Sequence, residues 1–136
     1  MQRLILALLL VVPIAAQADL EISDAWINNL PASVPVRAGY LTLHNPTQQA
    51  VTIVGATSAG FAGVEIHRSV SQDGMLRMEA VPKLHIEAGA TVRLAPGGLH
   101  LMMKQPAQPT SPGELYRITF EYADGSRQSL QIEVRK

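Results

Sequence analysis

The sequence of 136 residues contains no cysteine. This absence excludes thiolate metal sites, redox-active dithiols and cysteine nucleophiles, and it leaves no cysteine to carry a lipid. Disulfides are excluded too, so the fold must be stabilised by packing alone.

Neither sign of charge is in excess. The chain carries 11 Lys and Arg residues against 11 Asp and Glu residues, and no basic stripe or block of like charges is present. This distribution argues against nucleic-acid binding and against electrostatic docking to a membrane.

No apolar run reaches the ~20 residues that a membrane-spanning helix needs. Residues 4–12 form a shorter apolar run, which follows Arg3 and precedes the small-x-small sequence Ala16-Gln17-Ala18. This pattern predicts a secretory signal peptide over residues 1–18, cleaved after Ala18, and therefore a periplasmic protein. The alternative is an uncleaved membrane anchor. Cleavage leaves residues 19–136 with a net charge near −1, since Arg3 is lost, and no stable membrane insertion is expected.

Short β-strands dominate the rest of the pattern, and little of it is typical of helix. Asp73-Gly74 and Asp124-Gly125 are strong hairpin signals, and Pro or Gly clusters separate the other apolar segments. Residues 57–63 fit either a loop or a short helical turn. The strand-like segments are 20–27, 40–44, 51–54, 63–70, 75–81, 91–94, 99–104, 115–122 and 128–134, and the short segment 84–86 leads into a turn at 87–89.

About eight or nine short strands with turns between them are typical of an all-β, antiparallel Greek-key sandwich or barrel. No internal repeat or linker divides the mature sequence. We therefore expect residues 19–136 to form a single domain.

Methionine and histidine are clustered. Apart from Met1, the four methionines all lie within the 29 residues 75–103, and three of the four histidines lie in or beside the same window. Methionines that merely fill gaps in a core would be more scattered.

Strand geometry selects among these residues. His100 and Met102 share one face of a strand, because side chains alternate. With a two-residue loop at Asp73-Gly74, Ser69 faces Met78, and His67 then lies diagonal to Met78 at about 7–8 Å. Met75 and Met103 have the opposite parity, and His44 and His85 are expected at the surface.

Two thioethers and two imidazoles form a soft donor set, which favours Cu(I), or Ag(I) by analogy. Thioethers are not usual zinc ligands, and calcium needs a cluster of carboxylates. Glu65 could accept a hydrogen bond from a ligand imidazole. The alternative is a core role for Met78 and a surface role for His67. The candidate ligands are His67, Met78, His100 and Met102.

The spacing of these four residues resembles the His-x10-Met-x21-His-x-Met signature of the periplasmic PCuAC copper chaperones. Flanking segments agree, among them Val64-Glu65-Ile66-His67 and Pro96-Gly97-Gly98-Leu99-His100. The resemblance covers nearly the whole mature chain. The sequence departs from the family pattern at two places. Family members often carry an Arg shortly after the Trp, whereas Ile27-Asn28-Asn29 follows Trp26 here, and the given sequence ends without the His/Met-rich tail of some members.

The resemblance implies a cupredoxin-like sandwich that binds one Cu(I) per chain through the four residues. It also implies delivery of copper to a cytochrome c oxidase subunit or a Sco-type protein, so that the chain functions in cytochrome c oxidase assembly. We expect a monomer that acts as a metallochaperone by ligand exchange.

Other functions remain as alternatives. A periplasmic copper or silver buffer, or a resistance protein without a delivery role, would use the same site. A metal-free β-sandwich adaptor is a third possibility. An enzyme is the least favoured, because the sequence has no defensible Ser-His-Asp order, nucleophile elbow or paired carboxylates.

Overall fold

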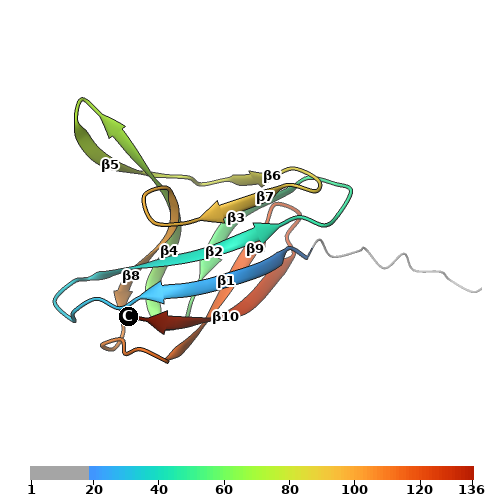
Figure 1. Cartoon of the computed structure of the whole chain (residues 1–136). Helices are drawn as coiled ribbons and strands as arrows, with labels where there is room; N and C mark the ends of the chain where they lie inside the picture. The colour runs from blue at the N-terminus through green and yellow to red at the C-terminus, as the bar shows by residue number, and fades with distance from the viewer. Residues whose placement is uncertain (1–18) are drawn as a thin grey trace, which may run out of the picture.

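The computed structural model describes residues 19–136, and the signal peptide expected over residues 1–18 lies outside the described residues (Figure 1). The described part of the chain contains ten strands and no helix. Residues 58–60 form a turn, which settles the ambiguity over 57–63. The strands are β1 (Glu21–Asn28), β2 (Val36–His44), β3 (Val51–Thr57), β4 (Phe61–Gln72), β5 (Met75–Ala80), β6 (Leu84–Ile86), β7 (Thr91–Leu94), β8 (Leu99–Pro106), β9 (Leu115–Tyr122) and β10 (Arg127–Arg135).

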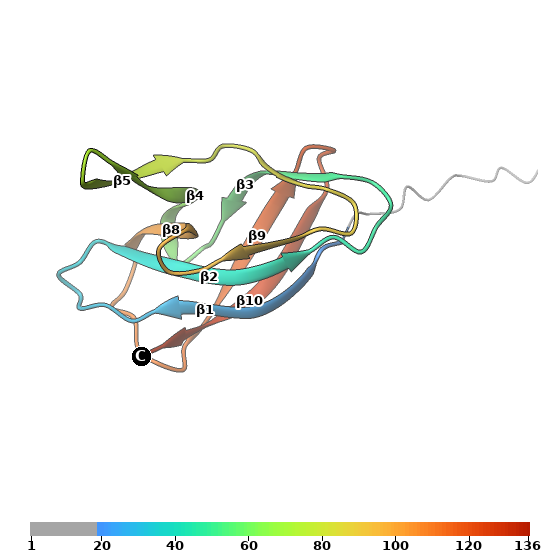
Figure 2. The ribbon, with the colours of Figure 1, turned by 45° about the horizontal axis from the view of Figure 1, so that its top comes forward.

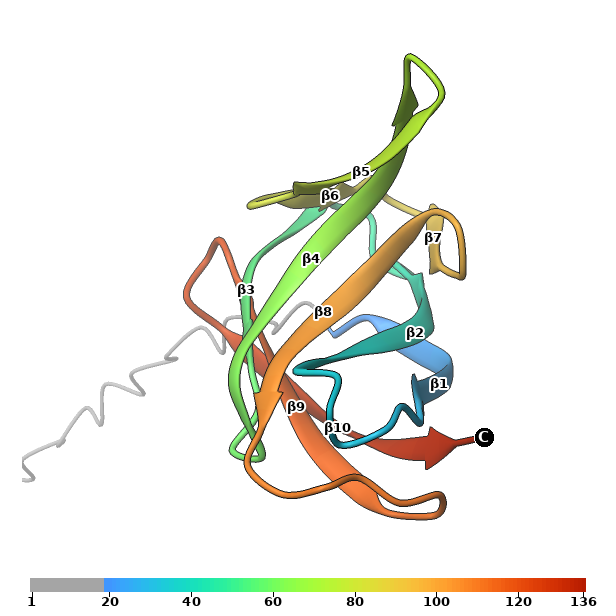
Figure 3. The same ribbon diagram turned by 90° about the vertical axis from the view of Figure 1, so that its left-hand side faces the viewer.

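These strands form one sheet in the order β5-β4-β8-β2-β1-β10-β9-β3-β6, with β7 paired to β2. A further pairing of β3 with β4, at Ala56 and Val64, closes the sheet on itself (Figure 3). The predicted all-β, cupredoxin-like sandwich is confirmed. One pair departs from the antiparallel expectation: β1 and β10, the first and last strands, are parallel. Parallel neighbours need a long connection, and here all the intervening strands provide it.

The core follows from alternation along the strands, because every second side chain points inward. In β8, Leu101 and Met103 are fully buried, whereas Met102 between them is only partly buried. The other fully buried large apolar side chains are Ile27, Leu41, Leu43, Ile53, Ile86, Ile118, Phe120, Ile132 and Val134.

The β4–β5 hairpin projects beyond the barrel (Figures 1 and 3). Its two-residue loop is Asp73-Gly74, with φ of 51° and 75°, as the favoured tight hairpin turn requires. All six residues of β5 are exposed, and β4 is its sole strand neighbour in the described chain. After β5 the chain returns along the barrel through β6 and β7 to β8 (Figure 2).

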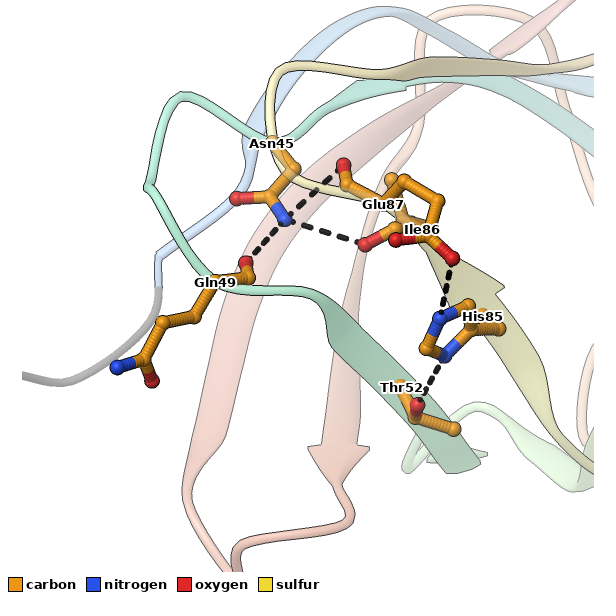
Figure 4. Close-up of polar contacts among 6 residues, drawn as sticks. All are labelled: Asn45, Gln49, Thr52, His85, Ile86 and Glu87. Carbon is orange, nitrogen blue, oxygen red and sulfur yellow. Dashed lines mark hydrogen bonds and ion pairs between the residues drawn. The ribbon is translucent and has the colours of Figure 1, made fainter.

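A buried asparagine anchors this return segment (Figure 4). The side-chain nitrogen of Asn45 donates to the carbonyl oxygens of Gln49 (2.7 Å), Ile86 (3.1 Å) and Glu87 (3.3 Å). It thereby ties the β2–β3 loop to the end of β6. Within residues 19–136, we find no helix with the length and apolar character required to cross a membrane.

Candidate metal centre

Two histidines from distant parts of the chain meet across the β4–β8 pair. His67 of β4 lies directly opposite His100 of β8 in the register. Their ring centroids are 6.1 Å apart, and the rings are tilted by 44°. Spacing and strand parity predict a methionine near each histidine but not this direct pairing, because the pairing depends on contact between strands that are not adjacent in the chain.

The two predicted methionines lie on the same face, on either side of the histidines. Met102 is opposite Glu65, two positions along β4 from His67. Met78 is opposite Ser69, two positions along β4 in the other direction. The predicted hairpin register is therefore confirmed. Met78 and Met102 are separated by two strand spacings and by four positions along β4, so the imidazoles lie between the two sulfur-bearing side chains.

This face points away from the hydrophobic core, and its exposure is graded. The buried side chains Leu101 and Met103 occupy the other face of β8. His100 is 6% exposed and the His67 side chain is 12% exposed, whereas Met78 is 54% exposed. The imidazoles are thus shielded, and Met78 lies at the solvent side of the group.

Hydrogen bonds assign the protons on both imidazoles. The Nδ1 of His100 lies 3.1 Å from the carbonyl oxygen of Gly98, which can only accept, so Nδ1 donates. In the neutral ring, Nε2 then keeps its lone pair. The Nε2 of His67 lies 2.7 Å from a carboxylate oxygen of Glu65 and donates to it in the same way. The remaining nitrogens, Nδ1 of His67 and Nε2 of His100, are buried without a hydrogen-bond partner in the described structure.

Glu65 also belongs to this group. Its second carboxylate oxygen accepts a hydrogen bond from Nζ of Lys104 at 2.9 Å. The hydrogen bonds from His67 and from Lys104 hold the pKa of Glu65 below its usual value. Glu65 is therefore a carboxylate at neutral pH and acts as an acceptor for both neighbours.

The arrangement offers two imidazole lone pairs with a thioether on each side. Neutral imidazole and thioether are donors for a soft, monovalent metal ion such as Cu(I). No cluster of three or more His, Cys, Asp or Glu residues suited to a metal ion is found within residues 19–136.

The residues left out of the predicted site lie elsewhere. Met103 is buried in the core, and Met75 is 65% exposed on the opposite face of β5. His44 contacts Thr91, and His85 contacts Thr52 and Glu87 (Figure 4). These contacts agree with the expected surface positions of the two histidines.

The fold defines a PCuAC-type β-domain. The copper-bound PCuAC domain of PmoF2 superposes with a TM-score of 0.71 at 16% identity, covering 85% of this chain and 92% of that domain. The Cu(I) form of DR1885 from Deinococcus radiodurans matches with a TM-score of 0.68 at 31% identity, covering 89% of this chain and 82% of the other.

The chain belongs to the LpqE-like family, described as "Putative lipoprotein LpqE-like", whose sequence model matches residues 20–134. "Putative lipoprotein Lxx21020" of Leifsonia xyli subsp. xyli is 31% identical over 121 residues, which cover 88% of this chain and 72% of the relative. Together with the structural neighbours, this match confirms the predicted relationship to the PCuAC family.

Proposed function

We propose that this protein is a periplasmic Cu(I)-binding metallochaperone. One Cu(I) ion per chain is its cargo, and the ligands are His67, Met78, His100 and Met102. Residues 19–136 form the single binding domain, and residues 1–18 are its cleaved signal peptide. The similarity to the Cu(I) form of DR1885 supports copper as the metal.

The observation that carries this proposal is the pair of unpartnered nitrogens. A buried nitrogen without a hydrogen bond costs roughly 1–3 kcal/mol, so two such atoms on facing rings need an explanation. A bound metal ion supplies one, because it would accept both lone pairs. The thioethers on the same face make a soft monovalent ion the best fit.

The exposure of Met78 supports transfer by ligand exchange. Met78 is the most exposed of the four side chains and lies on a projecting hairpin. A sulfur ligand from an acceptor protein can enter at this side while the Met78 sulfur leaves, and the two shielded imidazoles hold the metal meanwhile. No bond-making catalysis is required, so the protein functions as a carrier and not as an enzyme.

The acceptor in this proposal is a cytochrome c oxidase subunit or a Sco-type protein, and the chaperone acts as a monomer. Mixing the Cu(I)-loaded protein with a purified acceptor of this kind tests delivery. Transfer of copper to the acceptor supports the chaperone role, whereas retention by this protein favours the copper buffer.

The four methionines within residues 19–136 provide a matched test of the site. Leucine has nearly the volume of methionine but no sulfur, so these substitutions preserve packing. The double variant Met78→Leu/Met102→Leu removes both sulfurs from the proposed site. The control variant Met75→Leu/Met103→Leu removes both sulfurs from the opposite faces of the same strands.

We expect the site variant to bind Cu(I) at least about tenfold more weakly, which corresponds to ~1.4 kcal/mol, while the control variant binds like the wild type. Affinity is measured anaerobically by competition with a chromophoric Cu(I) chelator. Equal weakening in both double variants, or in neither, would remove the methionine pair from the proposal.

A further inference from the structure

Glu65 lies two residues before His67 on the same face of β4, and it makes two contacts that matter for the metal centre. One carboxylate oxygen is 2.7 Å from Nε2 of His67, and the other is 2.9 Å from Nζ of Lys104. The carboxylate therefore links a charged side chain of β8 to a proposed metal ligand of β4.

We infer that Glu65 is a positioning residue that holds His67 in the Nε2–H tautomer, so that Cu(I) is bound through Nδ1 of His67 and Nε2 of His100. This inference rests on the proposed function and adds the atoms that bind and the residue that selects them. The evidence for it is the hydrogen bond at Nε2 of His67 together with the unpartnered nitrogen on the other side of the ring.

The selection follows from elementary hydrogen bonding. A neutral imidazole carries one proton, which can reside on either nitrogen. A carboxylate only accepts, so it stabilises the tautomer with the proton on the nitrogen that faces it. The other nitrogen is then free to bind metal, and its basicity is raised by the negative partner.

Lys104 fixes the carboxylate in turn. Lys104 lies opposite Gly63 on β4, next to Glu65 along the same face. Gly63 has no side chain, and a Cβ placed there would lie 3.9 Å from Cδ of Lys104. The lysine side chain thus runs over the glycine and places its ammonium group beside Glu65.

His85 and Glu87 form a comparison pair within the same molecule. The Nε2 of His85 lies 2.9 Å from Glu87, also with a separation of two residues (Figure 4). The Nδ1 of His85, however, is occupied by the hydroxyl of Thr52 at 2.9 Å. The same carboxylate–histidine unit therefore leaves a free nitrogen at His67 but not at His85.

The test uses Glu65→Leu, which removes the acceptor, Glu65→Gln, which keeps a carbonyl acceptor, and Glu87→Leu as the matched control. Two-bond ¹H–¹⁵N NMR reads the tautomer of each histidine in the metal-free protein. The same spectra with Cu(I) show which ring nitrogen shifts on binding. Competition with a chromophoric chelator gives the Cu(I) affinity.

We expect the Nε2–H tautomer at His67 in the wild type and in Glu65→Gln, with Nδ1 as the nitrogen that shifts on addition of Cu(I). Glu65→Leu should give a mixture of tautomers and about tenfold weaker Cu(I) binding, as is typical when the partner of a ligand is lost. Glu87→Leu should alter His85 alone and leave Cu(I) affinity unchanged.

An Nδ1–H tautomer at His67 in the wild type, or a Cu(I)-induced shift at its Nε2, overturns the inference. So does a Glu65→Leu variant with unchanged tautomer and affinity. A wild-type protein that binds no Cu(I) contradicts the proposed function instead, and the tautomer measurement still reports on Glu65. If Glu65→Leu does not fold, the wild-type tautomer and the ring nitrogen that shifts on addition of Cu(I) still decide the inference.

Discussion

Gly39 shows how closely single residues are packed behind the proposed metal centre. It lies opposite Leu101 in the β2–β8 register. A Cβ at this position would lie 3.1 Å from Cβ and 3.2 Å from Cδ1 of Leu101, and 3.4 Å from the sulfur of Met103. The absence of a side chain at residue 39 thus leaves room for the inward-facing side chains of Leu101 and Met103 on the neighbouring strand β8, whose outward face carries His100 and Met102.

Gly39→Ala should therefore destabilise the protein by about 1–3 kcal/mol, the usual cost of overpacking a core. Gly55→Ala is the control, since a Cβ there meets nothing closer than 3.8 Å. Urea denaturation of both variants measures the free energy of unfolding. Equal denaturation midpoints for the two variants would contradict this account of Gly39.

Tyr122 gives a prediction for alkaline pH. Burial raises the pKa of Tyr122 from 10.0 to about 12, and its hydroxyl donates a hydrogen bond to Gln128. Below pH 10 the tyrosine is protonated in both the folded and the unfolded state. Between pH 10 and 12 only the unfolded state loses the proton, so the free energy of unfolding falls by up to about 1.4 kcal/mol per pH unit.

Tyr122→Phe should abolish this contribution. Denaturation at several pH values from 9 to 11 should show a steeper loss of stability in the wild type than in Tyr122→Phe. A parallel loss in both proteins would mean that Tyr122 is not the group responsible.

At the residue scale, spacing and strand parity were sufficient to predict which of the proposed ligands share one face of the sheet. They could not predict the free nitrogens, because these depend on the Gly98 carbonyl and on the Glu65 rotamer. Arg37 was missed for a similar reason. Its guanidinium is buried and donates to the neighbouring carbonyls of Val34 and Val36 and to Thr110. Thr110 lies in the loop between β8 and β9, and no local pattern indicates that this loop approaches Arg37.

Among the elements, the β4–β5 hairpin is the least secured. Its outer strand β5 pairs with β4 alone and buries none of its six residues, whereas β8 pairs with both β4 and β2. Strands with few buried contacts open locally at low free-energy cost. The hairpin therefore carries Met78 on a strand that can move without unfolding the barrel.

Hydrogen exchange should detect this difference. In the metal-free protein we expect the amides of β5 that bond to β4 to exchange faster than those of β8. Cu(I) should slow exchange in β5 once Met78 binds, while strands β9 and β10 remain unchanged as an internal control. Protection that is unaltered in β5 but altered elsewhere would exclude Met78 as a ligand.

Local sequence signals predicted strands and turns well where the paired segments are adjacent in the chain. Asp73-Gly74 fixed a two-residue loop, and the register of β4 with β5 followed from it. The start of β2 was missed, because its buried positions are Arg37 and Gly39 and not large apolar residues. This part of β2 also pairs with β8, a distant strand. The pairing of β1 with β10 joins the two ends of the described chain, which local patterns cannot indicate.

For the whole molecule, the proposed cargo should stabilise the fold. A ligand that binds only the folded state stabilises it by about 2.7 kcal/mol at a free concentration of 100 times its Kd. For 118 residues this corresponds to a rise in Tm of roughly 10 °C. Calorimetry under anaerobic conditions measures the shift, and Met78→Leu/Met102→Leu should show a smaller one. An equal rise in both proteins would indicate binding elsewhere.

The facing imidazoles come from positions 33 residues apart in the chain, on strands joined by β5, β6 and β7. In an unfolded chain the two imidazole rings are therefore not held next to each other. They face each other only after β4 has paired with β8. Under the proposed function, copper loading follows folding in time, and a newly exported chain acquires its copper only after it has folded. Conversely, separation of β4 from β8 would separate the two proposed histidine ligands and release the ion.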